Sequence, residues 1–307
     1  MTKILNFGSL NIDYVYAVAD FVRPGETIAA LSREINCGGK GLNQSIAAAG
    51  SGARVFHAGR IGGDGKMLLD ILKERGVNVD FVTVSDDKSS GHAIIQVNGE
   101  GQNSIIVCAA ENNEITESQI DDVLGNFSAG DFILLQNEIN NVPLIMKKAA
   151  SRGMRIVFNP SPLRDEIKDY PLELVSLFAV NEIEGAAIAN GFVSSEISAN
   201  PDNYDEILNK ISEIYPNSDV LLTLGSNGAV YRGRGEKDVF QPIFKVPVVD
   251  TTGAGDTMLG FFVGLTALGH TPASALELSA KASAITVSGK GAAPSIPTIG
   301  KVLARKW

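Results

Sequence analysis

The regular alternation of short apolar runs with longer segments of helical periodicity restricts the fold of this chain more than any other feature. The apolar runs are residues 4–7, 54–57, 132–135, 156–158, 178–180 and 220–224. Uninterrupted runs of this length are typical of β-strands covered on both faces. Residues 43–49, 66–75 and 143–151 lie between such runs and read as helices. Strands alternating with helices require right-handed crossovers, which predicts an α/β fold with a central, mainly parallel sheet flanked by helices.

Two segments, about 12–36 and 91–108, interrupt this alternation because they read as strands with no helix between them. The second contains Asn98-Gly99 between apolar runs, which is a strong hairpin signal. We therefore expect a small β-sheet inserted into the α/β body, with one face available as a lid or an interface. No linker or repeat divides the sequence, so residues 1–307 are predicted to form a single domain that carries this lid.

Charge and cysteine content exclude several classes of partner. The chain has 26 Lys and Arg against 35 Asp and Glu, a net charge of −9, and so no general field for nucleic acid or an anionic membrane. Cys37 and Cys108 form no disulfide framework and no metal-binding pattern, which fits a reducing cytoplasm. No signal-peptide pattern follows Lys3, and the most apolar stretch, 257–268, is too short to span a bilayer. We expect a cytoplasmic protein.

Two glycine clusters follow predicted strands and precede predicted helices, at residues 37–44 and 59–65. Glycine allows a ligand to approach the backbone closely, and helix N-termini favour anions or hydroxyl-rich ligands. The first cluster is not a Walker A loop, because Leu42 follows Gly41 where Lys is required. The second lacks the Rossmann register. Each cluster fits a ligand contact or a plain turn.

The third cluster, residues 250–257, is the most informative, because it opens a helix predicted from Met258 to Leu268. Gly253, Ala254 and Gly255 leave consecutive N–H groups unobstructed, which makes a cradle for negative charge on a transferring phosphoryl group. Asp256 beside such a cradle suits a base that accepts a hydroxyl proton. The alternative is that Asp256 is a plain helix cap.

These motifs together resemble the ribokinase family of carbohydrate kinases, and the resemblance covers essentially the whole chain in the family's order. The segments that carry it are 8–13, 37–44, 181–184, 223–225, 250–256 and 289–295. The resemblance implies the α/β fold above with a β-lid over a sugar site. It also implies transfer of the γ-phosphoryl group of ATP to a primary sugar hydroxyl.

The resemblance also implies roles for individual residues. Asp256 would be the base, with Gly253, Ala254 and Gly255 as the anion hole. The sugar pocket would be lined by Asn11, Asp13, Gly39, Lys40, Asn43 and Glu138. The nucleotide side would be formed by Asn181, Glu184, Thr223, Gly225 and Gly228. Asn181 and Glu184 also fit an ordinary helix start.

The implied cofactors are ATP, Mg²⁺ and an activating K⁺, and the implied assembly is a homodimer formed through the lid. Glu184 would hold Mg²⁺ through a water molecule. The monovalent cation would lie among Asp250, Thr252, Thr286, Gly291 and Ser295.

Segments 90–93 and 98–103 resemble the ribose-phosphorylating members of the family, which implies conversion of D-ribose to D-ribose 5-phosphate. Residues 107–112 depart from the family's usual run, and in the family these residues face the sugar. Fructose, 2-keto-3-deoxygluconate and nucleosides are therefore alternative substrates. An inactive sugar- or nucleotide-binding regulator is a further alternative, although the base and the Asn-x-x-Glu motif are both intact.

Overall fold

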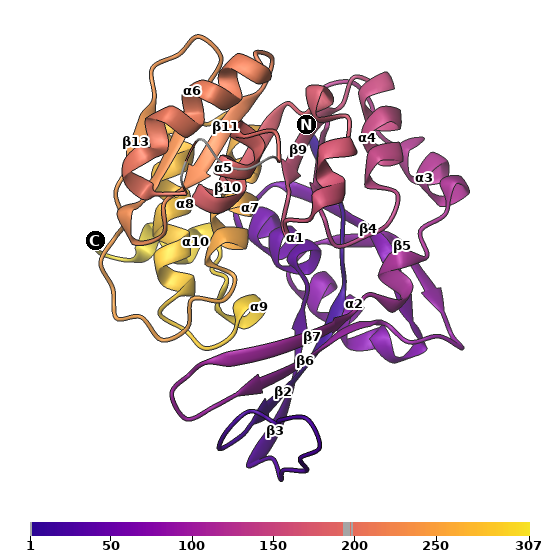
Figure 1. Cartoon of the computed structure of the whole chain (residues 1–307). Coiled ribbons are helices and arrows are strands. Elements are labelled where there is room, and N and C mark those ends of the chain that lie inside the picture. The colour runs from indigo at the N-terminus through magenta and orange to yellow at the C-terminus, as the bar shows by residue number, and fades with distance from the viewer. Residues whose placement is uncertain (1, 193–196, 198) are drawn as a thin grey trace.

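The computed structural model describes residues 2–192, 197 and 199–307, and its centre is a nine-stranded sheet (Figure 1). In spatial order its strands are β13 (Val239–Gln241), β12 (Ala229–Arg232), β11 (Asp219–Thr223), β10 (Leu177–Asn181), β9 (Arg155–Asn159), β8 (Phe132–Gln136), β1 (Lys3–Phe7), β4 (Arg54–Gly62) and β5 (Asn78–Ser85). The pairs from β5 to β11 are parallel, and β12 and β13 add antiparallel pairs at one edge. The prediction of a mainly parallel sheet is confirmed.

The order of the strands creates a switch point beside β1. The chain first proceeds from β1 to β4 and β5 on one side, and later from β8 to β11 on the other. Loops that leave β1 and β8 therefore diverge to opposite sides, which leaves a crevice at the carboxyl ends of these neighbouring strands. In open parallel sheets this crevice is the usual position of a ligand site.

Helices cover both faces of the large sheet. They are α1 (Lys40–Gly50), α2 (Lys66–Glu74), α3 (Glu117–Leu124), α4 (Val142–Ser151), α5 (Glu182–Ala189), α6 (Tyr204–Ile214), α7 (Ala254–Ala267), α8 (Pro272–Thr286), α9 (Ala292–Ser295) and α10 (Ile299–Ala304). Buried side chains of α3, α4, α5 and α6 form one hydrophobic core with the sheet. Those of α1, α2, α7 and α8 form a second core. Burial on both faces explains why the strands read as continuous apolar runs.

Helices α1 and α7 pack closely because α7 carries glycine at two positions one turn apart. A Cβ atom on Gly260 would lie 2.5 Å from the Cβ of Ala47 and 2.7 Å from the carbonyl oxygen of Gln44. A Cβ atom on Gly264 would lie 2.0 Å from the Oγ of Ser51. No side chain larger than hydrogen fits at either position without movement of a helix. The two glycines therefore set the separation between α1 and α7.

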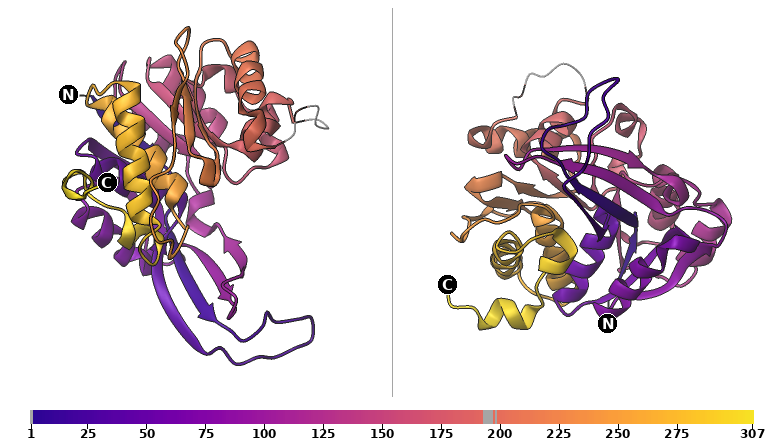
Figure 2. Two further views of the ribbon diagram at one scale, coloured as in Figure 1. Left: turned by 90° about the vertical axis from the view of Figure 1, so that its left-hand side faces the viewer. Right: turned by 90° about the horizontal axis from the view of Figure 1, so that it is seen from below.

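The second sheet has four strands and extends from one end of the body (Figures 1 and 2). Its strands, in spatial order, are β3 (Ser32–Gly38), β2 (Asn11–Ala17), β6 (Gly91–Val97) and β7 (Asn103–Cys108). They come from the two segments predicted to form strands without helices. The hairpin predicted at Asn98 is present. The side-chain oxygen of Asn98 accepts hydrogen bonds from the N–H groups of Glu100 (3.1 Å) and Gln102 (2.9 Å). Exposed apolar side chains gather on β7, where Ile106 is 63% and Val107 61% exposed.

The C-terminal residues pack onto the segment that follows β13. The rings of Trp307 and Phe244 lie 4.7 Å apart, and the ammonium group of Lys281 lies 5.2 Å from the Phe244 ring. Within the described residues no helix has the length and apolar character needed to cross a membrane.

Candidate active site

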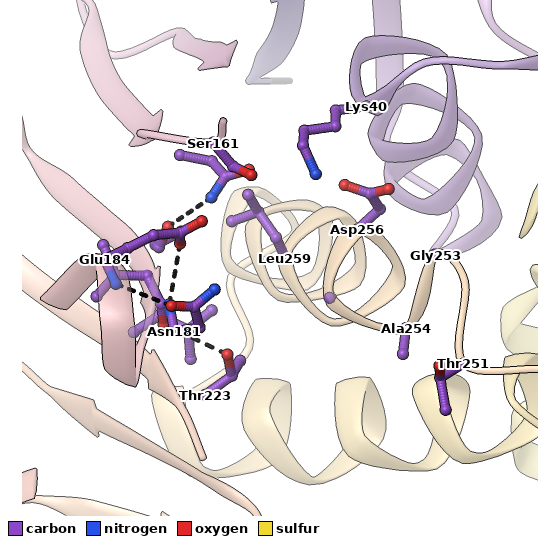
Figure 3. Close-up of a pocket in the computed structure, with 15 residues that line it drawn as sticks. Lys40, Ser161, Asn181, Glu184, Thr223, Thr251, Gly253, Ala254, Asp256 and Leu259 are labelled. Atoms are coloured by element: carbon purple, nitrogen blue, oxygen red, sulfur yellow. Dashed lines mark hydrogen bonds between the residues drawn. The ribbon is translucent and has the colours of Figure 1, made fainter. Parts of the chain in front are cut away.

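Polar side chains gather at the carboxyl ends of five parallel strands. Ser9, Glu138, Asn159, Asn181 and Thr223 lie at or just after the ends of β1, β8, β9, β10 and β11. The N-terminal turns of α1 and α7 face the same region (Figure 3). The sheet topology thus brings together side chains that lie far apart in the sequence, at the switch point where ligands bind in such folds.

Asp256 belongs to the first turn of α7, and its carboxylate is held by two amides of α1. The Nδ2 of Asn43 donates to one carboxylate oxygen (3.0 Å) and the Nε2 of Gln44 donates to the other (2.8 Å). Because Gly253 occupies the N-cap position of α7, the interpretation of Asp256 as a plain helix cap is wrong. The carboxylate is oriented by another helix and lines a cavity of about 170 Å³.

The glycine-rich turn before Asp256 differs in two respects from the sequence prediction. The helix begins at Ala254 rather than near Met258, because Gly253 adopts a positive φ of 77° and closes the first turn. The N–H of Ala254 donates to the carbonyl oxygen of Thr251 (3.2 Å), so this predicted anion-hole donor already has a partner in the protein. Gly253, Ala254 and Gly255 all line the cavity. A Cβ atom on Gly255 would meet open space, so packing alone does not explain glycine there.

Lys40 lies in this cavity, where its side chain is directed toward Asp256 (Figure 3). Burial by itself lowers the pKa of Lys40, but the charges of Asp256, Glu138 and Glu184 outweigh this effect and raise the pKa. Lys40, predicted to line the sugar pocket, lines the same polar cavity as Gly253 and Gly255, which were predicted to form the anion hole. A protonated Lys40 at this position neutralises part of a dense cluster of negative charge.

Glu138 and Asp13 form the acidic part of the predicted sugar side. The carboxylate of Glu138 accepts hydrogen bonds from the Oγ of Ser9 and from the N–H of Lys40 (2.9 Å). Burial raises the pKa of Glu138 despite the opposing charge of Lys40. Burial, together with the nearby Glu138, raises the pKa of Asp13 to about 7. A Cβ atom on Gly38 would overlap the Asp13 carboxylate and would force this side chain to move.

Asn11, predicted to line the sugar pocket, is held by Asn112. The Nδ2 of Asn112 donates to the Oδ1 of Asn11 (2.8 Å), and the Oδ1 of Asn112 accepts from the N–H of Leu10 (3.0 Å). A Cβ atom on Gly91 would collide with both side chains. Gly39 adopts φ 94° directly before α1 and lets the chain turn from β3 into the helix.

The predicted nucleotide residues surround two adjoining cavities. Thr223, Gly225 and Gly228 line a mainly apolar cavity of about 590 Å³, which adjoins the polar one through Thr223, Thr251, Ala254 and Gly255. Asn181 and Glu184 line the polar cavity and also form a capping box at the start of α5, so the helix-start interpretation describes their hydrogen bonds correctly. Burial raises the pKa of Glu184, although the N–H of Asn181 and the charge of Lys40 oppose this.

The predicted cation residues connect two loops beside the predicted anion hole. The carboxylate of Asp250 accepts from the N–H (2.9 Å) and hydroxyl (2.7 Å) of Thr252 and from the N–H of Gly291 (2.9 Å). Partial burial tends to raise the pKa of Asp250, but these hydrogen bonds outweigh it and lower the pKa. The Oγ of Ser295 donates to the carbonyl oxygen of Lys290 (3.0 Å), and the Thr286 side chain is buried against Thr257. Among the described residues no three His, Cys, Asp or Glu side chains form a metal cluster.

The sequence indicated no individual role for several residues that lie here: Ser9, Gln44, Asn159, Ser161 and Thr251. Asn112 belongs to segment 107–112, which was expected to face the sugar. Gln44 is adjacent to Asn43 in the glycine cluster at residues 37–44, and Asn159 directly follows the apolar run at residues 156–158, so the sequence held a signal for both. The cluster at residues 59–65 has a structural use: Asp64 accepts hydrogen bonds from the N–H (2.8 Å) and Oγ (2.7 Å) of Ser90.

Comparison with known proteins agrees with this geometry. The ribokinase of Bacillus subtilis is 33% identical over 306 residues, which are 98% of this chain and 98% of the relative. Among solved structures, the ribokinase of Cryptococcus neoformans in complex with ADP superposes with a TM-score of 0.85 at 31% identity and covers 100% of both chains. The ribokinase of Arabidopsis thaliana complexed with ribose and ATP gives a TM-score of 0.84 at 28% identity and covers 99% of this chain and 98% of that one.

The model of the pfkB family of carbohydrate kinases matches residues 1–299. Because this match includes both the strand-end side chains and the turn that opens α7, the chain belongs to the pfkB family of carbohydrate kinases.

Proposed function

We propose that this carbohydrate kinase transfers the γ-phosphoryl group of ATP to the primary hydroxyl of D-ribose and produces D-ribose 5-phosphate and ADP. The observation that carries the proposal is the position of Asp256. It lines the polar cavity together with Lys40 and Gly253, beside the residues expected to bind the sugar and the nucleotide, and Asn43 and Gln44 orient its carboxylate. The ribose specificity is supported by full-length relatives and solved structures that are named ribokinases.

In the proposed reaction Asp256 orients the primary hydroxyl of the sugar and accepts its proton as the oxygen attacks the γ-phosphorus. The new phosphorus–oxygen bond forms as the bond to the β-phosphate oxygen breaks, and ADP leaves with that electron pair. A primary alcohol is too weakly acidic to ionise at neutral pH, so a positioned proton acceptor assists the transfer. The partial positive charge at the start of α7, together with Lys40, would balance charge on the transferring group.

The proposed sugar pocket would discriminate between sugars by hydrogen bonding. Asn11, Asp13, Asn43 and Glu138 present carboxylates and amides that can pair with adjacent hydroxyls. The Oδ1 of Asn43 is buried and has no hydrogen-bond partner within the described protein, so a sugar hydroxyl could donate to it. A sugar that lacks a matching hydroxyl would leave such groups unpaired, which penalises the wrong substrate strongly.

The residues present also fit Mg²⁺, which binds through one or two carboxylates and keeps several water molecules. Glu184 is a buried carboxylate on the wall of the polar cavity, and we propose that it holds the ion through water. When bound, Mg²⁺ supplies charge neutralisation for the phosphate groups of ATP.

A monovalent cation such as K⁺ fits the oxygen-rich loops around Asp250. Carboxylate, hydroxyl and carbonyl oxygens suit a hard cation, and we propose that Asp250, Thr252, Thr286, Gly291 and Ser295 supply them. The ion would stiffen the loops that flank the anion hole. Equal rates in potassium chloride and tetramethylammonium chloride would contradict this proposal.

We further propose that the second sheet, formed from segments 12–36 and 91–108, acts as the lid over the sugar within a single domain of residues 1–307. Two copies would pair through it as a homodimer. An acidic net charge of −9 and two free cysteines, Cys37 and Cys108, fit an enzyme that works in the cytoplasm without a nucleic-acid or membrane partner.

A panel assay tests the function directly. ATP consumption would be measured with ribose, 2-deoxyribose, fructose, 2-keto-3-deoxygluconate and adenosine, and the phosphorylated position would be located by phosphorus NMR. We expect the highest kcat/KM with ribose and a product phosphorylated on the primary hydroxyl. A higher kcat/KM with fructose, the keto acid or adenosine would overturn the choice of substrate. Sugar binding by calorimetry without ATP consumption would indicate the inactive regulator.

A further inference from the structure

A row of four side-chain amides runs through the interior behind Asp256. It consists of Asn6 on β1, Gln136 on β8, Gln44 on α1 and Asn159 at the end of β9. Gln136 donates through Nε2 to the Oε1 of Gln44 (2.6 Å) and to the Oδ1 of Asn6 (3.0 Å). Gln44 donates through Nε2 to Asp256 (2.8 Å) and to the Oδ1 of Asn159 (3.2 Å). Asn6 and Gln136 are fully buried, and Gln44 is nearly so.

Two backbone carbonyl groups fix the orientation of every amide in this row. The Nδ2 of Asn6 donates to the carbonyl oxygen of Gly41 (2.7 Å), and the Nδ2 of Asn159 donates to that of Ala179 (2.9 Å). A carbonyl oxygen can only accept, so the side-chain oxygens of Asn6 and Asn159 must face their glutamine neighbours. Gln136 must then present its NH₂ group to Asn6 and Gln44, and Gln44 must present its own NH₂ group to Asp256.

We propose that Gln44 is a positioning residue for the carboxylate of Asp256, and that Gln136 sets the direction in which the Gln44 amide points. This inference rests on the proposed function, in which Asp256 is the base. If the Gln44 amide were reversed, its oxygen would face a carboxylate oxygen at hydrogen-bond distance, and the two acceptors would repel each other. Asp256 would then keep only Asn43 as a donor and could turn away from the sugar hydroxyl.

The environment of Gln136 supports the orientation in which its NH₂ group faces Asn6 and Gln44. Its Oε1 is buried and has no hydrogen-bond partner within the described protein. That oxygen faces Gly8, where a Cβ atom would lie 2.3 Å from it. Leaving a buried acceptor unpaired is unfavourable. The side chain nevertheless keeps this orientation, in which its NH₂ group serves both neighbours.

Methionine variants test the inference, because methionine has nearly the shape of glutamine but cannot donate. We expect Gln44→Met to lower kcat roughly 10- to 100-fold, as befits the loss of a hydrogen bond to a charged group. Gln136→Met should lower kcat about tenfold, since the donor to Asp256 remains but only Asn159 still fixes its direction. The KM values for ribose and ATP should stay within about twofold, because Gln136 contacts neither ligand. Gln119→Met, which alters a glutamine on α3 bonded to the carbonyl of Gly59, is the matched control and should leave kcat unchanged.

The double variant distinguishes a positioning role of Gln136 from a general packing defect. If Gln136 acts through Gln44, then Gln44→Met/Gln136→Met should have the kcat of Gln44→Met alone, whereas independent packing defects would multiply. Thermal denaturation would identify variants that fail to fold, and Gln136→Leu would replace Gln136→Met in that case. A parent-like kcat for the Gln136 variant, or multiplicative losses in the double variant, would overturn the inference. The proposed function fails separately, if Asp256→Asn keeps the parent kcat.

Discussion

At the scale of single residues, the site depends on amides that hold carboxylates. Asp256 has a hydrogen-bond donor on each oxygen, and Glu138 accepts from Ser9 and from the backbone of Lys40. Fixed donors of this kind keep a carboxylate in one orientation before the substrate arrives, so no reorganisation is needed during the reaction. We therefore expect kcat to depend most on the residues whose side chains already form hydrogen bonds within the protein.

Asp256→Asn tests the proposed base. Asparagine has the same size and still contacts a hydroxyl, but it cannot accept the proton. We expect kcat to fall about 10²- to 10⁴-fold, while sugar affinity measured by calorimetry changes little. Because Gly253 is the N-cap of α7, a structural capping defect is not expected to contribute. A kcat within about threefold of the parent, far short of the loss expected for a general base, would remove Asp256 from that role.

Asp13 should make the stability of the sugar-free protein depend on pH. Its pKa is about 7 in the folded chain, against an ordinary value of 3.8. Between these values the folded form holds a proton that the unfolded form has lost, so stability falls as the pH rises through this window. Asp13→Asn removes this contribution. Urea denaturation should therefore show the variant gaining stability relative to the parent from pH 5 to pH 8, and a constant difference would contradict the assignment.

At the scale of elements, the contact between α1 and α7 sets the geometry of the site. Asn43 and Gln44 on α1 reach Asp256 on α7 only because glycines on α7 let the helices approach closely. Small residues at a helix interface shorten the distance between helix axes. The interface between α1 and α7 therefore determines both the hydrophobic packing of the second core and the orientation of the proposed base.

Gly260→Ala should separate the two helices. The added methyl group has no room beside Ala47 and the backbone of Gln44, so we expect a loss of stability of roughly 1–3 kcal/mol. We also expect a lower kcat, because the hydrogen bonds to Asp256 lengthen. Urea denaturation and steady-state kinetics measure the two effects. Gly300→Ala on α10 is the matched control, because its Cβ would meet only the Oγ1 of Thr298, at 3.9 Å. Equal effects of the two substitutions would contradict this view.

The sequence predicted the elements better than their contacts. The strands, the helices and the two segments that form the second sheet follow from local apolar patterns, and strand-end residues such as Asn181 follow from their position in these patterns. The hydrogen bond from Gln44 to Asp256 joins residues 212 apart and depends on helix packing, which no local pattern encodes. The start of α7 was placed too late because glycine disfavours helix interiors, whereas Gly253 with positive φ begins the helix here.

At the scale of the whole molecule, the two sheets contribute different residues to the candidate site. The large sheet collects strand ends at its switch point, and the second sheet supplies Asn11 and Asp13 from β2. Strand β7 lies at an edge of the second sheet and is exposed along its full length. Natural proteins cover such apolar edges, and a two-fold axis would let two copies cover each other.

Ile106→Lys tests the proposed homodimer. Ile106 is 63% exposed on β7, and a charge at this position should prevent the burial of the sheet face. We expect the parent to sediment as a dimer at micromolar concentration and the variant as a monomer. Leu303→Lys alters an apolar side chain on α10 that is 67% exposed, and it should leave the dimer intact. A monomeric parent would rule out the proposed assembly.

The packing of Trp307 on Phe244 gives this protein its own optical probe. Trp307 is the single tryptophan of the chain, and Phe244 lines the apolar cavity proposed for the nucleotide. A nucleotide that enters this cavity displaces solvent beside Phe244 and changes the surroundings of the indole ring. In a stopped-flow experiment the emission of the unmodified protein should therefore follow the arrival of the nucleotide, so that nucleotide binding can be timed separately from phosphoryl transfer.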